Sequence, residues 1–239
     1  MKEELNAFIE FALKEDVQDG DHTSLACIPP TASGKAQLLV KENGILAGME
    51  VALAIFEKVN PDIQFSPLMH DGESMTVGDV AFIVEGPSSS ILTAERLVLN
   101  CMQRMSGIAT KTQHIVKLLE GTKAQVLDTR KTTPGIRLLE KWAVKIGGGA
   151  NHRFGLYDMM MIKDNHIDFA GGIESAIAKA INYQKDKGIN IPIEVEARNL
   201  EEVNEILRVG NIQRIMLDNF SYDDTPVSYT HLRAHETSD

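Results

Sequence analysis

The run PIEVEA, at residues 192–197, has the form of a short buried strand that ends in residues able to bind a ligand. Three other runs share this form, and they are QVLDTR (125–130), MMMIKDN (159–165) and RIMLDN (214–219). The segments between them show helical periodicity, most clearly at Ile173–Lys187 and Leu200–Val209. Alternation of buried strands with helices predicts a parallel sheet, of the kind found in α/β barrels.

Each of the four runs changes from apolar to polar or charged residues at its carboxyl end. In α/β barrels the loops at that end form the mouth of the active site. Glu194 and Glu196 lie on the same face of their strand because side chains alternate with a period of two. A carboxylate deep in a barrel is costly to bury, so Glu196, nearer the rim, is the expected ligand-facing acid.

The first part of the chain has a different pattern. Amphipathic or apolar periodicity predicts helices at residues 1–16, Met49–Val59 and Thr93–Leu119. Alternation predicts strands at Lys35–Lys41 and Asp79–Glu85. This part is therefore expected to be α+β, with helices set against a mainly antiparallel sheet.

Composition limits the classes of function. The 239 residues are 43% hydrophobic and carry a formal net charge of -10, which argues against nonspecific nucleic-acid binding. No apolar run approaches the ~18 residues that a membrane span requires, and the N-terminus lacks the features of a secretory signal. We expect a cytoplasmic protein that binds neither membranes nor nucleic acid. Cys27 and Cys101, far apart and flanked by apolar residues, are expected to be buried free thiols.

One segment departs from the negative charge of the whole. Residues 129–153 contain six basic residues and one acid, Glu140, so that six minus one leaves +5. A local positive charge of this size suits a small anionic ligand better than a polymer. Lys141 and Lys145, four residues apart, are interpreted as part of a solvated helix face.

The sequence DTRKTTPGIR (128–137) is a candidate anion site. Arg130 and Lys131 directly follow an expected strand, Thr129 adds a hydroxyl donor, and Pro134-Gly135 predicts a turn with exposed amides. Arginine, lysine and threonine at a strand end form a good cradle for an anion. The alternative is an ordinary polar loop.

Three further motifs carry cations. GGGANHRFGLYD (147–158) places His152 and Arg153 after a glycine run that permits close backbone approach and positive φ. Lys163 stands at another strand end, and Arg104 lies on a helix in NCMQRMSGIAT (100–110). Taken singly, these are typical of a flexible turn, a solvent-exposed lysine and a surface arginine.

Together the motifs predict one site with a cationic and an acidic side. If the strand assignment holds, the basic residues expected at the barrel mouth are Arg130, Lys131, His152, Arg153 and Lys163. Glu196 and Asp218 complete the rim. This combination fits a polyanionic substrate accompanied by Mg²⁺, with those two acids as candidate metal ligands. The His/Cys spacing of a dedicated zinc site is not found in the sequence.

In their order and spacing these four motifs, with LKEDVQDGDHTS at 13–24, resemble the quinolinate phosphoribosyltransferase family. The likeness runs from about Leu5 to Phe220. The resemblance implies an N-terminal α/β sandwich domain at residues 1–108 and an incomplete, TIM-like α/β barrel at 109–225. It also implies a homodimer or a multiple of dimers.

The resemblance further implies transfer of a phosphoribosyl group from phosphoribosyl pyrophosphate (PRPP) to quinolinate, with decarboxylation to nicotinate mononucleotide in NAD biosynthesis. No organic cofactor is implied. Arg104 would reach the neighbouring subunit's site. The residues implied to hold the two carboxylates of quinolinate are Arg130, His152, Arg153 and Lys163, and Thr129 is a further substrate-binding residue. Lys131, Glu196 and Asp218 would face PRPP and Mg²⁺ and serve as catalytic residues.

The end of the chain departs from this pattern. After Phe220 it reads SYDDTPVSYTHLRAHETSD, with no apolar stripe and no strand of useful length. Residues 226–239 are interpreted as a foreign, disordered tail, and the barrel is expected to be truncated before closure because four strands cannot close one. Such a chain is expected to bind quinolinate yet turn over poorly.

Three alternatives remain open. The first is a barrel decarboxylase or aldolase in which Lys163 forms a Schiff base. The second is a catalytically impaired fragment that only binds anions or a partner subunit. The third is a paralogue that uses another pyridine acceptor, although Arg104, Arg130, His152 and Arg153 together favour a dicarboxylate.

Overall fold

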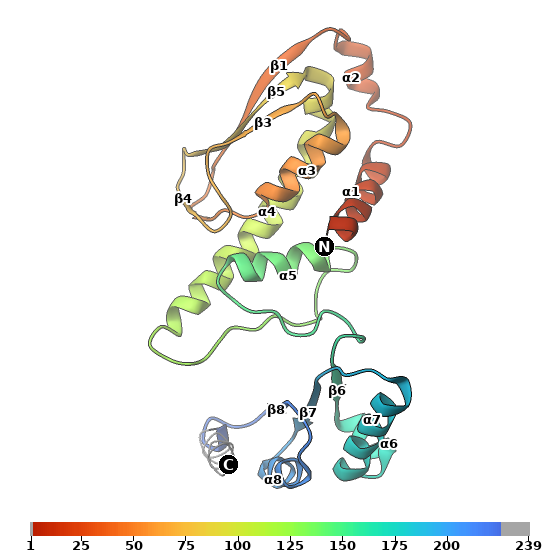
Figure 1. Cartoon of the computed structure of the whole chain (residues 1–239). Helices are drawn as coiled ribbons and strands as arrows, with labels where there is room; N and C mark the ends of the chain where they lie inside the picture. The colour runs from red at the N-terminus through yellow and green to blue at the C-terminus, as the bar shows by residue number, and fades with distance from the viewer. Residues whose placement is uncertain (1, 226–239) are drawn as a thin grey trace. The chain divides into compact units, whose positions relative to one another are not determined.

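The computed structural model describes residues 2–225, which divide into two compact units between His152 and Arg153 (Figure 1). Within this range no helix combines the length and the apolar character needed to cross a membrane. The predicted foreign tail at 226–239 lies outside the described residues, so its character stays a prediction.

The first unit sets helices against an antiparallel sheet. Its elements are α1 (Lys2–Asp16), α2 (His22–Cys27), β1 (Ser33–Leu39), β2 (Gly44–Ile45), α3 (Met49–Val59), β3 (Gln64–Pro67), β4 (Ser74–Met75), β5 (Val80–Pro87), α4 (Ser88–Leu118) and α5 (Arg137–Ile146). Strand β5 is central, with β1 and β3 antiparallel on either side, and β2 pairs with β4 separately. This is the α+β arrangement that the sequence predicts.

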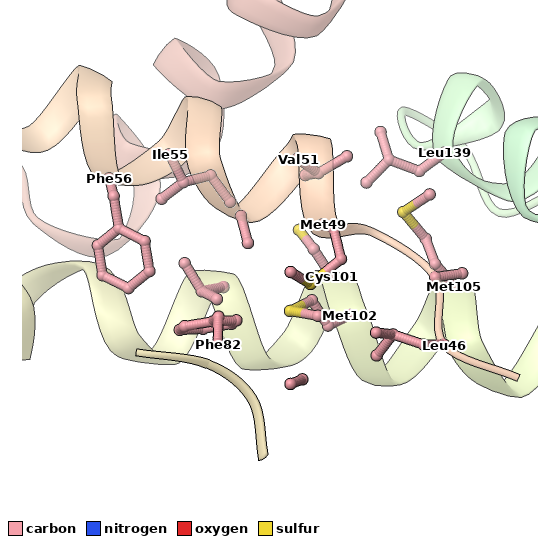
Figure 2. Close-up of a cluster of buried hydrophobic side chains, with 14 of the residues drawn as sticks. Leu46, Met49, Val51, Ile55, Phe56, Phe82, Cys101, Met102, Met105 and Leu139 are labelled. Atoms are coloured by element: carbon pink, nitrogen blue, oxygen red, sulfur yellow. The ribbon is translucent and has the colours of Figure 1, made fainter. Parts of the chain in front are cut away.

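The core of the first unit lies between α3, α4 and β5. Val51, Ala52 and Ile55 on α3 are fully buried because they recur on one face of the helix. Figure 2 shows Ile55 of α3 and Met102 of α4 between these two helices, with Met105 of α4 lying toward Leu139 of α5. From the sheet, Phe82 packs edge-on against Phe56, with ring centroids 5.9 Å apart.

The second unit is built from strands that alternate with helices (Figure 1). Its elements are β6 (Met160–Ile162), α6 (Asp164–Ala170), α7 (Ile173–Lys187), β7 (Ile193–Ala197), α8 (Leu200–Val209) and β8 (Arg214–Leu217). The strands are parallel in the order β6-β7-β8. Val195 on β7 is fully buried against α7 and α8, in a core that includes Ile177 and Ile206. The prediction of a parallel sheet with intervening helices is confirmed.

One predicted barrel strand is wrong. Residues 125–130 form no strand but a single parallel bridge, in which Leu127 pairs with Ala150. The partner segment follows a glycine run and is irregular, so it offers no extended edge for a longer ladder. Among residues 2–225 the second unit therefore has three paired strands, and these do not close into a barrel.

The two cysteines differ in exposure. Both are free, as predicted, and Cys101 is buried on α4. Cys27, however, is exposed at the end of α2, so its predicted burial was wrong. Helix α2 has only six residues, and too few of its side chains reach the core to bury its last turn.

Candidate active site

The loop that joins α4 to α5 carries the first group of predicted ligands. Thr129 and Lys131 are exposed, and the Lys131 backbone N–H donates to Thr129 Oγ1 at 3.0 Å. Arg130 is partly buried, and its Nε is fully buried without a hydrogen-bond partner among the described residues. A buried donor of this kind costs free energy unless a ligand or water accepts from it, which makes Arg130 a suitable anion-binding residue.

The glycine run at the end of α5 approaches neighbouring backbone closely, as predicted. A Cβ on Gly147 would lie 2.4 Å from the Ala109 carbonyl oxygen, and one on Gly149 would lie 3.2 Å from the Val126 carbonyl oxygen. Gly148 has a φ of +89°, a conformation that favours glycine. The glycines thus let the segment that carries His152 pack against α4 and α5.

A buried ion pair joins the two loops. Lys141 on α5 donates to the Asp128 carboxylate, and these side chains are 2% and 6% exposed. The interpretation of Lys141 as solvated is therefore wrong, since its ammonium is buried and paired with a carboxylate that offsets the cost of burying the charge. Lys145 is exposed, as predicted.

The same carboxylate organises the His152 backbone. Asp128 Oδ1 accepts from the His152 N–H at 2.9 Å, while Lys141 Nζ donates to the His152 carbonyl at 3.1 Å. The Asn151 side-chain amide donates to Asp128 Oδ2 and, at 2.9 Å, to the Lys141 carbonyl. His152 and the loop of Arg130 are thus tied to one another inside the first unit.

Arg104 is bound by its own chain. Its Nε and Nη2 donate to Glu140 Oε1 at 2.9 and 2.6 Å, and Nη2 also reaches Thr133 Oγ1 at 3.3 Å. Glu140 Oε2 accepts from the Thr133 N–H at 3.0 Å. Burial alone would raise the pKa of Glu140, but the hydrogen bonds from Arg104 and Thr133 outweigh it and hold that pKa below its ordinary value. Glu140 is therefore a stable carboxylate that orients Arg104.

Arg153 opens the second unit as a buried side chain, 8% exposed. Its Nη1 donates to the Met159 carbonyl at 3.2 Å. The turn that follows is closed by Asp158, whose carboxylate accepts from the N–H groups of Phe154 and Gly155 at 2.7 and 2.8 Å. The FGLYD sequence thus serves to fold the chain back so that Arg153 meets the backbone that leads into β6.

The remaining predicted residues lie at the carboxyl ends of the parallel strands. Lys163 follows β6 directly, and its ammonium forms an ion pair with Glu196 of β7 at 2.7 Å. Asp218 follows β8, with its backbone N–H bound to the Ala197 carbonyl at 2.9 Å and its carboxylate exposed. These three residues meet at one edge of the sheet, as the strand pattern predicts.

The candidate residues therefore form two groups. The first unit holds Arg104, Thr129, Arg130, Lys131 and His152, and the second holds Arg153, Lys163, Glu196 and Asp218. Convergence of both groups on one mouth stays a prediction.

Sequence reasoning missed the supporting side chains Asp128, Glu140, Lys141 and Asn151. The one available signal was the single acid in the basic segment, Glu140, because a lone carboxylate among six cations is well placed to pair with one of them.

The acidic residues fit a magnesium ion only in part. Among residues 2–225 no cluster of three or more His, Cys, Asp or Glu side chains could hold a metal by itself. Glu196 already pairs with Lys163, whereas the exposed Asp218 carboxylate accepts from the Asn219 side-chain amide at 3.1 Å. Mg²⁺ commonly binds one or two carboxylates together with substrate phosphates and water. The residues present suit an ion that arrives with a phosphorylated substrate.

Two protein-family models together match most of the chain. Residues 21–106 match the family model described as "Quinolinate phosphoribosyl transferase, N-terminal domain", and residues 108–237 match the corresponding C-terminal domain. The two matches meet between residues 106 and 108, whereas the compact units of the structure divide between His152 and Arg153, so the boundary at 108/109 stays a prediction. The second match continues through most of the segment from 226 that we expected not to resemble the family.

Individual relatives agree with the family models. The chain is 47% identical over 222 residues to the chloroplastic nicotinate-nucleotide pyrophosphorylase (carboxylating) of Arabidopsis thaliana, covering 90% of this chain and 63% of that protein. It is 38% identical to a probable nicotinate-nucleotide pyrophosphorylase of Synechocystis, covering 92% of this chain and 72% of that protein. The chain thus spans somewhat less than two thirds of the length of the plant relative.

Solved structures show the same fold. NadC from Streptococcus pyogenes superposes with a TM-score of 0.90 at 36% identity, covering 98% of this chain and 82% of that one. The nicotinate-nucleotide pyrophosphorylase of Francisella tularensis gives a TM-score of 0.89 at 37% identity, covering 98% of this chain and 81% of that one.

Proposed function

The chain belongs to the quinolinate phosphoribosyltransferase family, and from that premise we propose that its site binds quinolinate and PRPP for phosphoribosyl transfer. The products would be nicotinate mononucleotide, pyrophosphate and CO₂, which makes the activity that of a pentosyltransferase in NAD biosynthesis. The observation that carries the proposal is Arg130, whose buried Nε has no protein partner among residues 2–225.

Quinolinate is a planar dianion that needs paired, directional donors. A guanidinium fork matches a carboxylate in a bidentate way that an ammonium cannot. Arg130, with His152, Arg153 and Lys163, would hold the two carboxylates, and Thr129 would add a hydroxyl. The ion pair of Lys163 with Glu196 suits this binding role better than a Schiff-base role, which requires a neutral amine.

The PRPP side of the site is assigned to Lys131, Glu196 and Asp218. In the transfer the pyridine nitrogen attacks C1 of the ribose and pyrophosphate leaves, which generates oxocarbenium character that nearby carboxylates stabilise. The 2-carboxylate then leaves as CO₂ because the quaternised nitrogen stabilises the electron pair left on that ring carbon, which takes up a proton from water to give the product. Mg²⁺, bound with PRPP by Glu196 and Asp218, would neutralise charge on the departing pyrophosphate. The chemistry calls for no organic cofactor.

The quaternary arrangement and location follow the same premise. We propose a homodimer, or a multiple of dimers, in which Arg104 enters the neighbouring subunit's site. The Arg104 side chain is 54% exposed on α4 although Glu140 binds it, so it remains accessible to a second chain. The proposed location is the cytoplasm.

Calorimetric titration with quinolinate tests the proposal, with nicotinate as the monocarboxylate control. Quinolinate should bind. Nicotinate should bind much more weakly because it lacks the second carboxylate, so the cations that hold that group are left without a partner. Arg130→Lys keeps the positive charge but loses the bidentate guanidinium. It should weaken quinolinate binding on the order of 10-fold or more. Arg153→Ala should abolish binding. A folded protein that ignores quinolinate, or that binds nicotinate equally well, would refute the proposed substrate.

A further inference from the structure

We propose that Lys141 and Asp128 are positioning residues of the anion site. Neither is assigned to a substrate. Their buried ion pair holds the loop that carries Arg130 and Lys131 against the segment that carries His152. The inference rests on the proposed function, which assigns these cations to quinolinate and PRPP.

Asp128 and Lys141 bind each other, and both bind the backbone of His152. Asp128 immediately precedes Thr129 and Arg130, so its position sets where their backbone begins. One of its oxygens accepts from Lys141 Nζ and from the His152 N–H, the second at 2.9 Å. Lys141 Nζ also donates to the His152 carbonyl at 3.1 Å. Both backbone polar groups of His152 are thereby fixed by one ion pair.

The backbone of the two segments reinforces this arrangement. The Ala150 N–H donates to the Val126 carbonyl at 2.8 Å, and the Asp128 N–H donates to the Ala150 carbonyl at 3.1 Å. These two bonds constitute the isolated bridge at Leu127. So short a ladder fixes the register of two loops only weakly, and side-chain contacts must supply the rest.

Stability alone is a poor explanation for the pair. Removing two charges from water is costly, and buried ion pairs can often be replaced by apolar residues without loss of stability. A lysine four residues further along the same helix, Lys145, is exposed. The ion pair of Lys141 with Asp128 instead fixes the positions of the two segments that carry candidate ligands. At such a site a misplacement of about 1 Å can lower function by about 100-fold.

The test uses three variants of the full chain. Asp128→Asn combined with Lys141→Met removes both charges and leaves no unpaired buried ion. Asn151→Ala removes the amide that bridges Asp128 and the Lys141 carbonyl, and it alters only an exposed residue. Lys145→Met is the matched control, since it makes the same chemical change on the same helix outside the network.

Two readouts separate positioning from general loss of stability. The dissociation constant for quinolinate is measured by calorimetry at a temperature where denaturation curves show each variant to be folded. It should rise on the order of 10- to 100-fold in the double variant, several-fold in Asn151→Ala, and not in Lys145→Met. Amide hydrogen exchange at His152, measured without ligand, should accelerate in the first two variants only.

The outcomes are distinct. Unchanged affinity and unchanged His152 exchange in a folded double variant would overturn the proposal, and so would the same result in Asn151→Ala if the double variant does not fold. If the unaltered chain fails to bind quinolinate, the proposed function is refuted. Faster His152 exchange in the double variant would then still support a positioning role for the pair.

Discussion

Glu140 Oε1 accepts hydrogen bonds from two nitrogens of the Arg104 guanidinium, at 2.9 and 2.6 Å, although the two residues are 36 positions apart. The Glu140 side chain is 7% exposed and that of Arg104 54%. A buried carboxylate thus binds two nitrogens of an arginine side chain that is itself largely exposed. Glu140 thus fixes the orientation of Arg104, which we propose as a ligand of the anionic substrate.

Glu140→Gln should lower the free energy of unfolding by about 1–2 kcal/mol near neutral pH, because charge-assisted hydrogen bonds are lost. The pKa of Glu140 lies below its ordinary value of 4.5 in the folded state, so its stabilisation is present above the unfolded-state pKa. That stabilisation is lost as pH falls through the folded-state pKa.

Urea unfolding at several pH values measures this difference. The gap between the unaltered chain and Glu140→Gln should shrink as the pH is lowered below about 4.5. Glu57→Gln, which changes an exposed glutamate on α3, is the control and should have little effect at any pH. A gap that is constant or grows in acid would contradict the assigned role of the Glu140 charge.

The two cysteines should react with thiol reagents at very different rates. Burial raises the pKa of Cys101 to about 11, so the reactive thiolate is scarce at neutral pH and reagents cannot reach it. Cys27 is exposed. Titration of the native protein should give one rapid equivalent that Cys27→Ser eliminates, with the second appearing only on denaturation. Two rapid equivalents would show that α4 opens readily.

Glu196→Gln and Lys163→Met should separate the two ends of the proposed site. Loss of the Lys163 ammonium should weaken quinolinate binding on the order of 10-fold or more, because one carboxylate of quinolinate loses a charged partner. Loss of the Glu196 charge should leave quinolinate affinity unchanged or tighter, because Lys163 no longer has a competing anion, while it weakens PRPP binding with Mg²⁺.

Calorimetry with each ligand checks this division. Glu202→Gln is the matched control, because Glu202 forms an ion pair with Arg198 in the same unit and its side chain is, like that of Glu196, 12% exposed. If Glu196→Gln weakened quinolinate binding as strongly as Lys163→Met, Glu196 would belong to the part of the site that binds quinolinate.

Ile55→Ala should destabilise the first unit strongly. Ile55 is fully buried between α3 and α4, and truncation of such a side chain costs about 2–5 kcal/mol through lost burial and the cavity left behind. Leu53→Ala on the same helix is the control, because Leu53 is 36% exposed and should cost far less. Denaturant unfolding compares the two, and equal losses would place the core of α3 on a different face.

Local periodicity was enough to locate most helices and strands. The helices at Met49–Val59, Ile173–Lys187 and Leu200–Val209 occur where their apolar patterns place them, because burial of one face repeats every three to four residues. The same reasoning placed Lys163, Glu196 and Asp218 at the carboxyl edge of a parallel sheet. The motifs around Arg130 and His152 pointed to an anion site from residue chemistry alone.

The tertiary structure decided the partners of charged residues. Lys141 and Lys145 have the same local spacing, yet one is buried against Asp128 and the other is exposed, because only one of them faces the loop that precedes Arg130. Arg104 likewise acquires Glu140 from a helix far away in sequence. Residues 125–130 have the composition of a strand but lack an extended partner. Such outcomes depend on which segments meet in space, and local patterns carry no information about that.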